Sequence, residues 1–183
     1  MCQSCLAAKQ TRNSFPQASR WRADEPLELL HIDLCGPITL ETFGGNKYFL
    51  LIVDDCTRWM DVTVLKTKDQ AGSTFAKFKA EAENNLGYKI KTVRSDRGGE
   101  FLAVAFKEIC EQAGNNRELT APYSPKQNGV VERRNRTVME MSRSLLKSMK
   151  VSGRVWGEAV RHSMHLLNRL PTKAMGSRTP FEA

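Results

Sequence analysis

The sequence contains no long hydrophobic run. No stretch approaches the roughly 18 consecutive apolar residues that a membrane-spanning helix needs, and the N-terminus has no apolar segment of the kind found in secretory signals. These absences argue against a membrane protein and against a secreted one. We therefore expect a soluble intracellular protein with no membrane partner.

Cysteine is too sparse for a disulfide framework. The five cysteines are an odd number. Three of them, Cys35, Cys56 and Cys110, stand alone within or beside predicted secondary structure, where cysteine usually acts as a small buried hydrophobe. Cys2 and Cys5 have the C-x-x-C spacing of half a tetrahedral zinc site, which makes them a possible partial zinc site.

Acidic residues are outnumbered by basic ones. The 28 Lys and Arg against 20 Asp and Glu give a formal net charge of +8 and a pI near 9.4. This charge favours a polyanionic partner without identifying it. Much of the excess falls within about thirty residues and predicts a basic helical surface: Arg133, Arg134, Arg136, Arg143, Lys147, Lys150, Arg154 and Arg161.

The 183 residues, 40% of them hydrophobic, are enough for one domain with a proper core. From Leu29 onward apolar residues alternate with others, which predicts a strand that carries Asp33 near its end and stops at Gly36. Apolar runs and alternation predict further strands over residues 48–53, 58–65, 90–95 and 117–121.

Four stretches have apolar residues at helical spacing: residues 69–87, 98–113, 130–149 and 155–170. Two prolines and a glycine predict a loop between Pro122 and Gly129. Helices that follow strands indicate an α/β architecture.

Three acids stand at the ends of these elements. Asp33 leaves the first strand, Asp96 closes the fourth, and Glu132 lies in the first turn of the long helix. Two-metal phosphodiester chemistry needs carboxylates that converge from separate elements. Spacing alone does not single out these three, because most acids in a chain are surface charges or helix caps.

Three segments resemble the integrase catalytic core of copia-type long-terminal-repeat retrotransposons. They are His31-Ile32-Asp33-Leu34-Cys35-Gly36-Pro37, Ser95-Asp96-Arg97-Gly98-Gly99-Glu100-Phe101 and the stretch from Pro122 to Arg133. Thirty-five residues separate Asp96 from Glu132, an interval that this family shares with retroviral integrases. The resemblance implies a ribonuclease H-like α/β fold, in which a five-stranded mixed sheet is flanked by helices on both faces.

The resemblance also implies a function and a domain plan. Asp33, Asp96 and Glu132 would hold two Mg²⁺ or Mn²⁺ ions for DNA 3′-end processing and strand transfer. Residues 1–25 would be the remnant of a zinc-binding domain with a basic linker, 26–171 the catalytic core, and 172–183 a truncated C-terminal extension. The full-length protein would form homo-oligomers and act in the nucleus and in cytoplasmic virus-like particles.

Around the acids, the resemblance implies contacts with DNA ends, since the side chains concerned suit phosphates and unstacked bases: Tyr123, Lys126, Gln127, Asn128, Asn135 and Arg136. The family completes its zinc site with two upstream histidines, which this sequence lacks. Two thiolates cannot close such a site, so we expect no zinc bound by this chain alone.

Two other interpretations stay open. In the first, the chain is a truncated, inactive element remnant that only binds nucleic acid. Asn115 and Asn116 favour it, because they stand where an apolar residue would enter the fifth strand, and an unpartnered core asparagine costs roughly 1 to 3 kcal/mol. In the second, the chain is a host ribonuclease of the same fold, which we would not expect to carry the loop from Pro122 to Glu132.

Overall fold

The computed structural model describes residues 21–120 and 128–183. Cys2, Cys5, Tyr123, Lys126 and Gln127 lie outside these ranges. The described part contains five strands, β1 (Leu29–Cys35), β2 (Tyr48–Asp54), β3 (Met60–Leu65), β4 (Thr92–Ser95) and β5 (Asn116–Leu119). Its α-helices are α2 (Gln70–Leu86), α3 (Gly99–Leu102), α4 (Val104–Gln112), α5 (Gly129–Met149) and α6 (Trp156–Asn168), followed by single 3₁₀ turns such as η4 (Pro180–Glu182).

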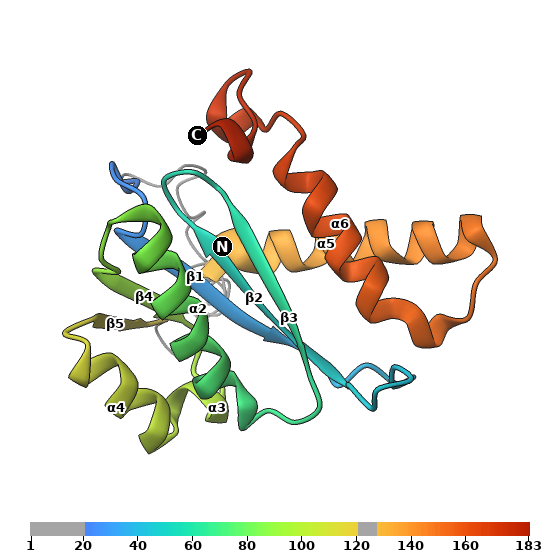
Figure 1. The fold of residues 1–183 in the computed structure, drawn as a ribbon, viewed down its shortest axis with the longest axis horizontal. Helices are drawn as coiled ribbons and strands as arrows, with labels where there is room; N and C mark the ends of the chain where they lie inside the picture. Colours follow the sequence, from blue (N-terminus) through green and yellow to red (C-terminus); the bar gives the residue numbers. More distant parts are fainter. Residues whose placement is uncertain (1–20, 121–127) are drawn as a thin grey trace, which may run out of the picture.

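The strands form one mixed sheet in the order β3-β2-β1-β4-β5 (Figure 1). β1 is antiparallel to β2 and parallel to β4, and β3 and β5 continue these two halves as antiparallel and parallel neighbours. Short connections join the first three strands, which pair as antiparallel neighbours. The parallel strands β4 and β5 are each reached through helices, as parallel pairing requires. The sheet order confirms the predicted five-stranded mixed sheet.

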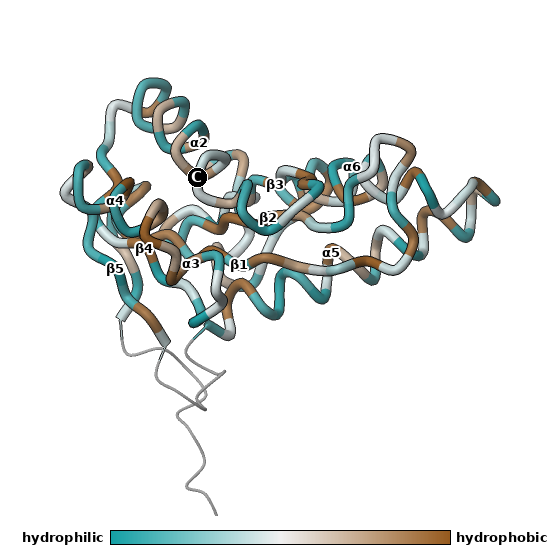
Figure 2. Tube along the Cα trace, turned by 90° about the horizontal axis from the view of Figure 1, so that it is seen from below, coloured by the Kyte–Doolittle hydropathy of each residue, from teal (hydrophilic) through white to brown (hydrophobic). Residues whose placement is uncertain are grey.

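Each face of the sheet is covered by its own helices (Figure 1). On one face, Leu30, Ile32 and Ile52 pack with Phe75 of α2 and Phe106 of α4. On the other face, a second core joins the sheet to α5 and α6: Phe49, Leu51, Val53, Val131, Val138, Trp156 and Val160. The most apolar stretches of the chain run through the strands, between the two helical layers (Figure 2). Helices on both faces are therefore confirmed.

Two elements differ from the prediction in ways that the local structure describes. The fourth strand begins at Thr92 and not at Ile90, because side chains satisfy the backbone of Ile90: its N–H donates to Glu83 Oε1 at 2.9 Å, and its carbonyl accepts from Asn115. The helix expected over 98–113 is broken into α3 and α4 at Ala103, whose φ of −57° and ψ of 142° are extended.

The asparagine pair at the start of β5 does not carry the expected defect in full. Asn116 is exposed. Asn115 is buried, yet its amide nitrogen donates to the carbonyl of Ile90, and only its Oδ1 lacks a partner. The pair therefore gives little support to the interpretation of the chain as a decayed remnant.

Within the described ranges, no helix is both long enough and apolar enough to cross a membrane.

Asn168 joins α6 to the edge strand β3. Its side chain is fully buried, its Oδ1 accepts from the N–H of Met60 at 3.0 Å, and its Nδ2 donates to the carbonyl of Met60 at 2.8 Å. We expect Asn168→Ala to lower the free energy of unfolding by about 2 kcal/mol, because two buried backbone groups lose their partners. Urea unfolding measures the change, with Asn84→Ala on exposed α2 surface as the control. Equal effects of the two substitutions would contradict the role of Asn168.

Candidate active site

Asp33 lies near the end of the central strand, on the face that α5 covers. β1 places Asp33 opposite Leu51, a residue of the core beneath α5. The preceding residues Leu30, His31 and Ile32 are buried, whereas Asp33 is half-buried, so the strand gives its carboxylate access to solvent only at this end. Gly36 then ends the strand at a φ of +132°, where an added Cβ would lie 2.7 Å from Lys47 O. The sequence must place glycine there.

The register of the sheet aligns Asp96 with Asp33. The parallel pairing of β1 and β4 includes His31 opposite Arg94, and two further steps along both strands lead to residues 33 and 96. The pairing of β1 with β4 stops before these two residues, so the two carboxylates lie where β1 and β4 are no longer paired with each other, while Asp33 stays paired with Leu51 of β2. The Asp96 carboxylate accepts from the N–H of Gly98 at 2.9 Å. An added Cβ at Gly98 would lie 3.0 Å from Asp96 Oδ1, so the turn has little room for a side chain.

Glu132 enters from the first turn of α5 and is exposed. Its pKa is raised by partial burial and by the charge of Asp96, while Arg136, one turn later, lowers it. Burial and the charges of Asp96 and Glu132 raise the pKa of Asp33 to about 6. The charge of Asp96 thus acts on both other acids, and the charge of Glu132 acts on Asp33, at the end of β1.

The three carboxylates are not arranged as a finished metal site. Among the described residues, no group of three or more His, Cys, Asp and Glu side chains is placed to hold a metal ion. The chemistry of the donors does fit a hard divalent cation, because carboxylate oxygens are the ligands that Mg²⁺ and Mn²⁺ prefer. Burial, and after it the charges of Asp96 and Glu132, raises the pKa of Asp33, and a bound cation would stabilise the ionised carboxylate.

Asn135 has a role that we did not predict. It is buried on α5, and its amide nitrogen donates to the Asp33 carboxylate, which lowers the pKa of Asp33 against the effect of burial. We expected Asn135 at the DNA, but in this structure its side chain positions Asp33. Its spacing of three residues from Glu132 was the available signal, because that spacing places both on nearly the same helix face.

Asn128 is buried at the start of α5. Only 1% of it is exposed, and its amide nitrogen lies 3.4 Å from the carbonyl of Ile32, which ties the start of α5 to β1. Its contact with DNA stays a prediction. Arg136 is exposed, one turn beyond Glu132, where a phosphate could reach it.

A buried ion-pair network lies behind Asp33 on the same strand. The His31 Nε2 is 3.0 Å from Asp55 Oδ1, and Arg58 Nη1 donates to the same oxygen at 2.8 Å. The hydrogen bonds from His31 and the Ala23 N–H, with the charge of Arg58, hold the pKa of Asp55 at about 2 despite its burial. His31 is therefore a structural neighbour of Asp33, and Asp55 is a structural acid.

This geometry defines a class of protein: a ribonuclease H-like domain with acids at the ends of β1 and β4 and at the start of α5. Residues 23–125 match the family model described as "Integrase core domain". The match covers more than half of the chain, and the chain belongs to the integrase core domain family.

Similar proteins support the membership of this family. The chain is 44% identical over 179 residues to "Retrovirus-related Pol polyprotein from transposon TNT 1-94" of Nicotiana tabacum, which covers 98% of this chain and 13% of the polyprotein. It is 33% identical over 181 residues to the Pol polyprotein from transposon RE1 of Arabidopsis thaliana, covering 99% of this chain and 12% of the relative. The chain thus spans about an eighth of these relatives. The predicted resemblance to copia-type integrase cores is confirmed.

A solved structure supports the fold. A chain of the simian T-cell lymphotropic virus intasome, in complex with PP2A regulatory subunit B56 gamma, matches with a TM-score of 0.75 at 17% identity. The match covers 99% of this chain and 62% of the viral one. It confirms the ribonuclease H-like fold.

The electrostatics of Asp33 predict a pH-dependent stability. Because the pKa of Asp33 is raised from 3.8 to about 6 in the folded state, its contribution to stability is present below pH 4 and is lost as the pH rises through 6. In EDTA, Asp33→Asn should therefore raise the free energy of unfolding relative to the parent chain by about 2 kcal/mol more at pH 7.5 than at pH 4. Urea unfolding at both pH values measures this difference. The exposed Asp69→Asn serves as the control, and a gain for Asp33→Asn that does not change with pH would contradict the prediction.

Proposed function

We propose that the chain is the catalytic core of a retrotransposon integrase that joins DNA ends to target DNA. The observation that carries the proposal is the electrostatic coupling of Asp33 to both Asp96 and Glu132 in a chain of the integrase core family. The expected roles of these residues come from the family resemblance, and the geometry of the sheet edge supports them.

Asp33 and Asp96 would hold one divalent ion, and Asp33 with Glu132 a second. Bound ions of this kind activate a water or DNA 3′-hydroxyl as the nucleophile and stabilise the leaving oxygen. Since the three acids are not placed as a finished ligand set, we infer that Glu132, on the exposed first turn of α5, is the one that would move when ions and DNA bind. Its place in the first turn of α5 allows this, because the first turn has fewer hydrogen bonds than the middle of a helix.

The protein contributes positioning. The amide of Asn135 donates to one oxygen of Asp33 and so holds the orientation of the carboxylate. Gly98 fixes one oxygen of Asp96 through its backbone N–H. Arg136 offers a guanidinium to a phosphate beside Glu132.

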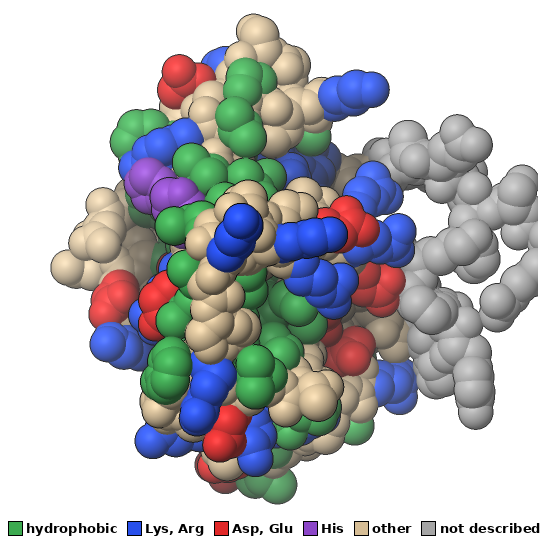
Figure 3. Space-filling model, turned by 90° about the vertical axis from the view of Figure 1, so that its right-hand side faces the viewer, with side chains coloured by type: hydrophobic (Ala, Val, Ile, Leu, Met, Phe, Trp, Pro, Cys, Tyr) green, Lys and Arg blue, Asp and Glu red, His purple; other side chains and the backbone are tan. Residues whose placement is uncertain are grey.

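DNA is the partner that we infer. The net charge is +8. Many Lys and Arg side chains lie on the face of the molecule where α5 ends and α6 begins (Figure 3). Multimers are a further inference, supported by the structural likeness to a chain of a viral intasome. The inactive remnant stays the alternative, favoured by the incomplete arrangement of the three carboxylates.

Activity should depend on all three acids. In a strand-transfer or disintegration assay with Mn²⁺, we expect Asp33→Asn, Asp96→Asn and Glu132→Gln each to lower the rate at least about 100-fold, because each removes a carboxylate from the ion ligands. Glu140→Gln, an exposed change on the same helix as Glu132, should keep the rate. Mn²⁺ should also raise the melting temperature of the parent chain and not that of Asp33→Asn.

The outcomes separate the two interpretations. A parent chain that is as inactive as its three variants, and whose melting temperature Mn²⁺ does not change, would support the remnant. Activity that survives in Asp96→Asn would remove Asp96 from the site.

DNA binding should fall steeply with salt, because each neutralised phosphate releases counterions. Arg136→Ala should weaken binding and reduce the slope of log K against log salt by about 1, the effect of one lost phosphate contact. Lys77→Ala, on exposed α2 across the sheet, should leave the slope unchanged. Fluorescence anisotropy with a labelled duplex gives both values, and a flat salt response of the parent chain would rule out the DNA partner.

A further inference from the structure

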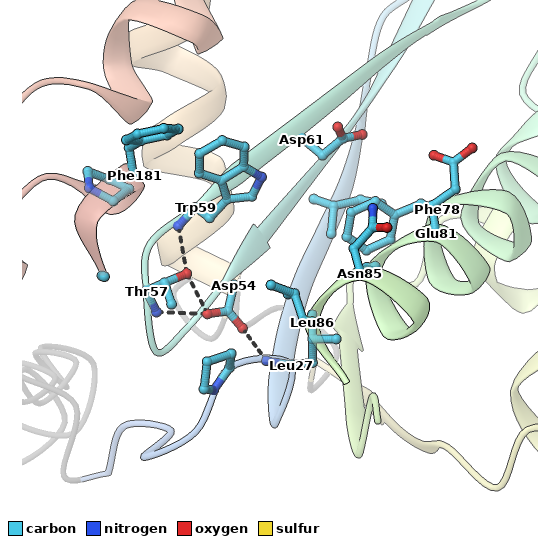
Figure 4. A pocket seen from close by; sticks show the side chains of 15 residues that line it. Leu27, Asp54, Thr57, Trp59, Asp61, Phe78, Glu81, Asn85, Leu86 and Phe181 are labelled. Atoms are coloured by element: carbon cyan, nitrogen blue, oxygen red, sulfur yellow. Dashed lines mark hydrogen bonds between the residues drawn. The ribbon is translucent and has the colours of Figure 1, made fainter. Parts of the chain in front are cut away.

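A pocket lies on the sheet face opposite α5, away from the three acids of the candidate active site. It is bounded by β2 and β3, by the C-terminal half of α2 and by the η4 turn, and its volume is about 430 Å³. Figure 4 shows Trp59 and Phe181 on one side and Phe78 and Leu86 of α2 on the other. Its walls are thus largely aromatic and aliphatic.

The fold explains why this corner is open. In β3, Met60, Val62 and Val64 point to the core beneath α6, so the residues between them face α2. One of these is Asp61, paired with Ile52 of β2. A polar residue at this place leaves the edge of the sheet without the apolar side chain that would fill the space under α2. The last residues of the chain reach the corner through Phe181, whose ring centroid is 6.2 Å from that of Trp59.

The charged groups that line the pocket all have one sign. They are Asp54, Asp61 and Glu81, and no Lys or Arg is among the described residues that line it, although the protein carries a net charge of +8. Asp54 is satisfied, since its carboxylate accepts from the N–H of Leu27 at 2.9 Å and from both the N–H and Oγ1 of Thr57 at 2.7 Å.

Asp61 and Glu81 are the two acids of the pocket that could accept a ligand cation. Among the described residues, Asp61 makes no hydrogen bond or ion pair, and burial together with the charge of Glu81 raises its pKa. Glu81 has only the loose pair with Lys77 at 3.9 Å, in which both side chains are largely exposed. A half-buried carboxylate in an apolar wall is stabilised when a cation approaches it.

We propose that this pocket binds a Lys or Arg side chain together with a neighbouring apolar side chain, both from a basic segment of a partner protein. The cation would pair with Asp61 and Glu81. The apolar side chain would enter between Trp59 and Phe78, and an aromatic ring beside the cation adds a cation–π contribution. The complementarity of charge commits the site to a basic occupant, and the apolar walls distinguish it from nucleic acid, whose phosphates the two carboxylates would repel.

NMR titration of the ¹⁵N-labelled chain tests this without metal or DNA, so its result is independent of the integrase activity. The probe is the peptide acetyl-Leu-Arg-Leu-amide, with acetyl-Leu-Glu-Leu-amide and acetyl-Gly-Arg-Gly-amide for comparison. We expect the first peptide to shift the Trp59 indole signal, assigned with Trp59→Phe, and to bind at least tenfold more tightly than the other two.

Variants decide whether the acids are responsible. The double variant Asp61→Asn, Glu81→Gln should bind acetyl-Leu-Arg-Leu-amide at least tenfold more weakly than the parent chain. The double variant Glu108→Gln, Glu111→Gln makes the same change of charge on exposed α4 and should bind like the parent.

Three results would overturn the proposal. They are equal affinity of the Asp61 and Glu81 double variant and the parent chain, equal affinity for acetyl-Gly-Arg-Gly-amide, and shifts that map away from the pocket. Concentration-dependent self-association that is abolished by the same double variant would identify a second copy of the chain as the occupant and would equally refute a peptide partner.

Discussion

The candidate site depends on one constraint, that the central strand β1 is buried on both faces and still ends in a carboxylate. β1 is hydrogen-bonded on both sides, to β2 and β4, and sends Leu30 and Ile32 into one core. Its other face carries His31, which is buried with its Nε2 3.0 Å from Asp55 Oδ1. Only at the end of the strand does burial decrease, and there the sequence has Asp33. Any shift of register by one residue would turn Asp33 to the opposite face, away from α5.

The burial that fixes Asp33 also makes its charge unfavourable. Desolvation and the charges of Asp96 and Glu132 act in the same direction, and the hydrogen bond from Asn135 offsets them only in part. Groups whose ionisation is disfavoured in this way, at the open end of a sheet, are typical of functional sites. Asp55 is the contrasting case. His31 and Arg58 stabilise its ionised form and lower its pKa, so its charge is already paired within the protein.

Much of the fold could be predicted because it follows from alternation and helical spacing. The strand ends that carry Asp33 and Asp96 are local features, and the sheet order confirms the architecture built on them. What escaped prediction depends on contacts between distant residues. The burial of Asn128 against Ile32 and the bond of Asn135 to Asp33 each join α5 to β1, across about a hundred residues of chain, and no periodicity encodes such a pair. The pocket is a similar case, since Trp59 and Phe181 meet only in the folded chain.

The two faces of the sheet differ in the sign of the charges that they leave unpaired. On the α5 side, the exposed Arg136 lies one turn beyond Glu132 and lowers its pKa, and a cation near these acids suits an approaching polyanion. On the α2 side, Asp61 and Glu81 face an apolar pocket lined by no basic residue in the described part of the chain. Side chains of β3 alternate between the two faces of the sheet. Met60 and Val62 enter the core beneath α6, and Asp61 between them faces the α2 side. The two proposed partners, nucleic acid and a basic protein segment, would therefore bind on opposite faces, with the thickness of one sheet between them.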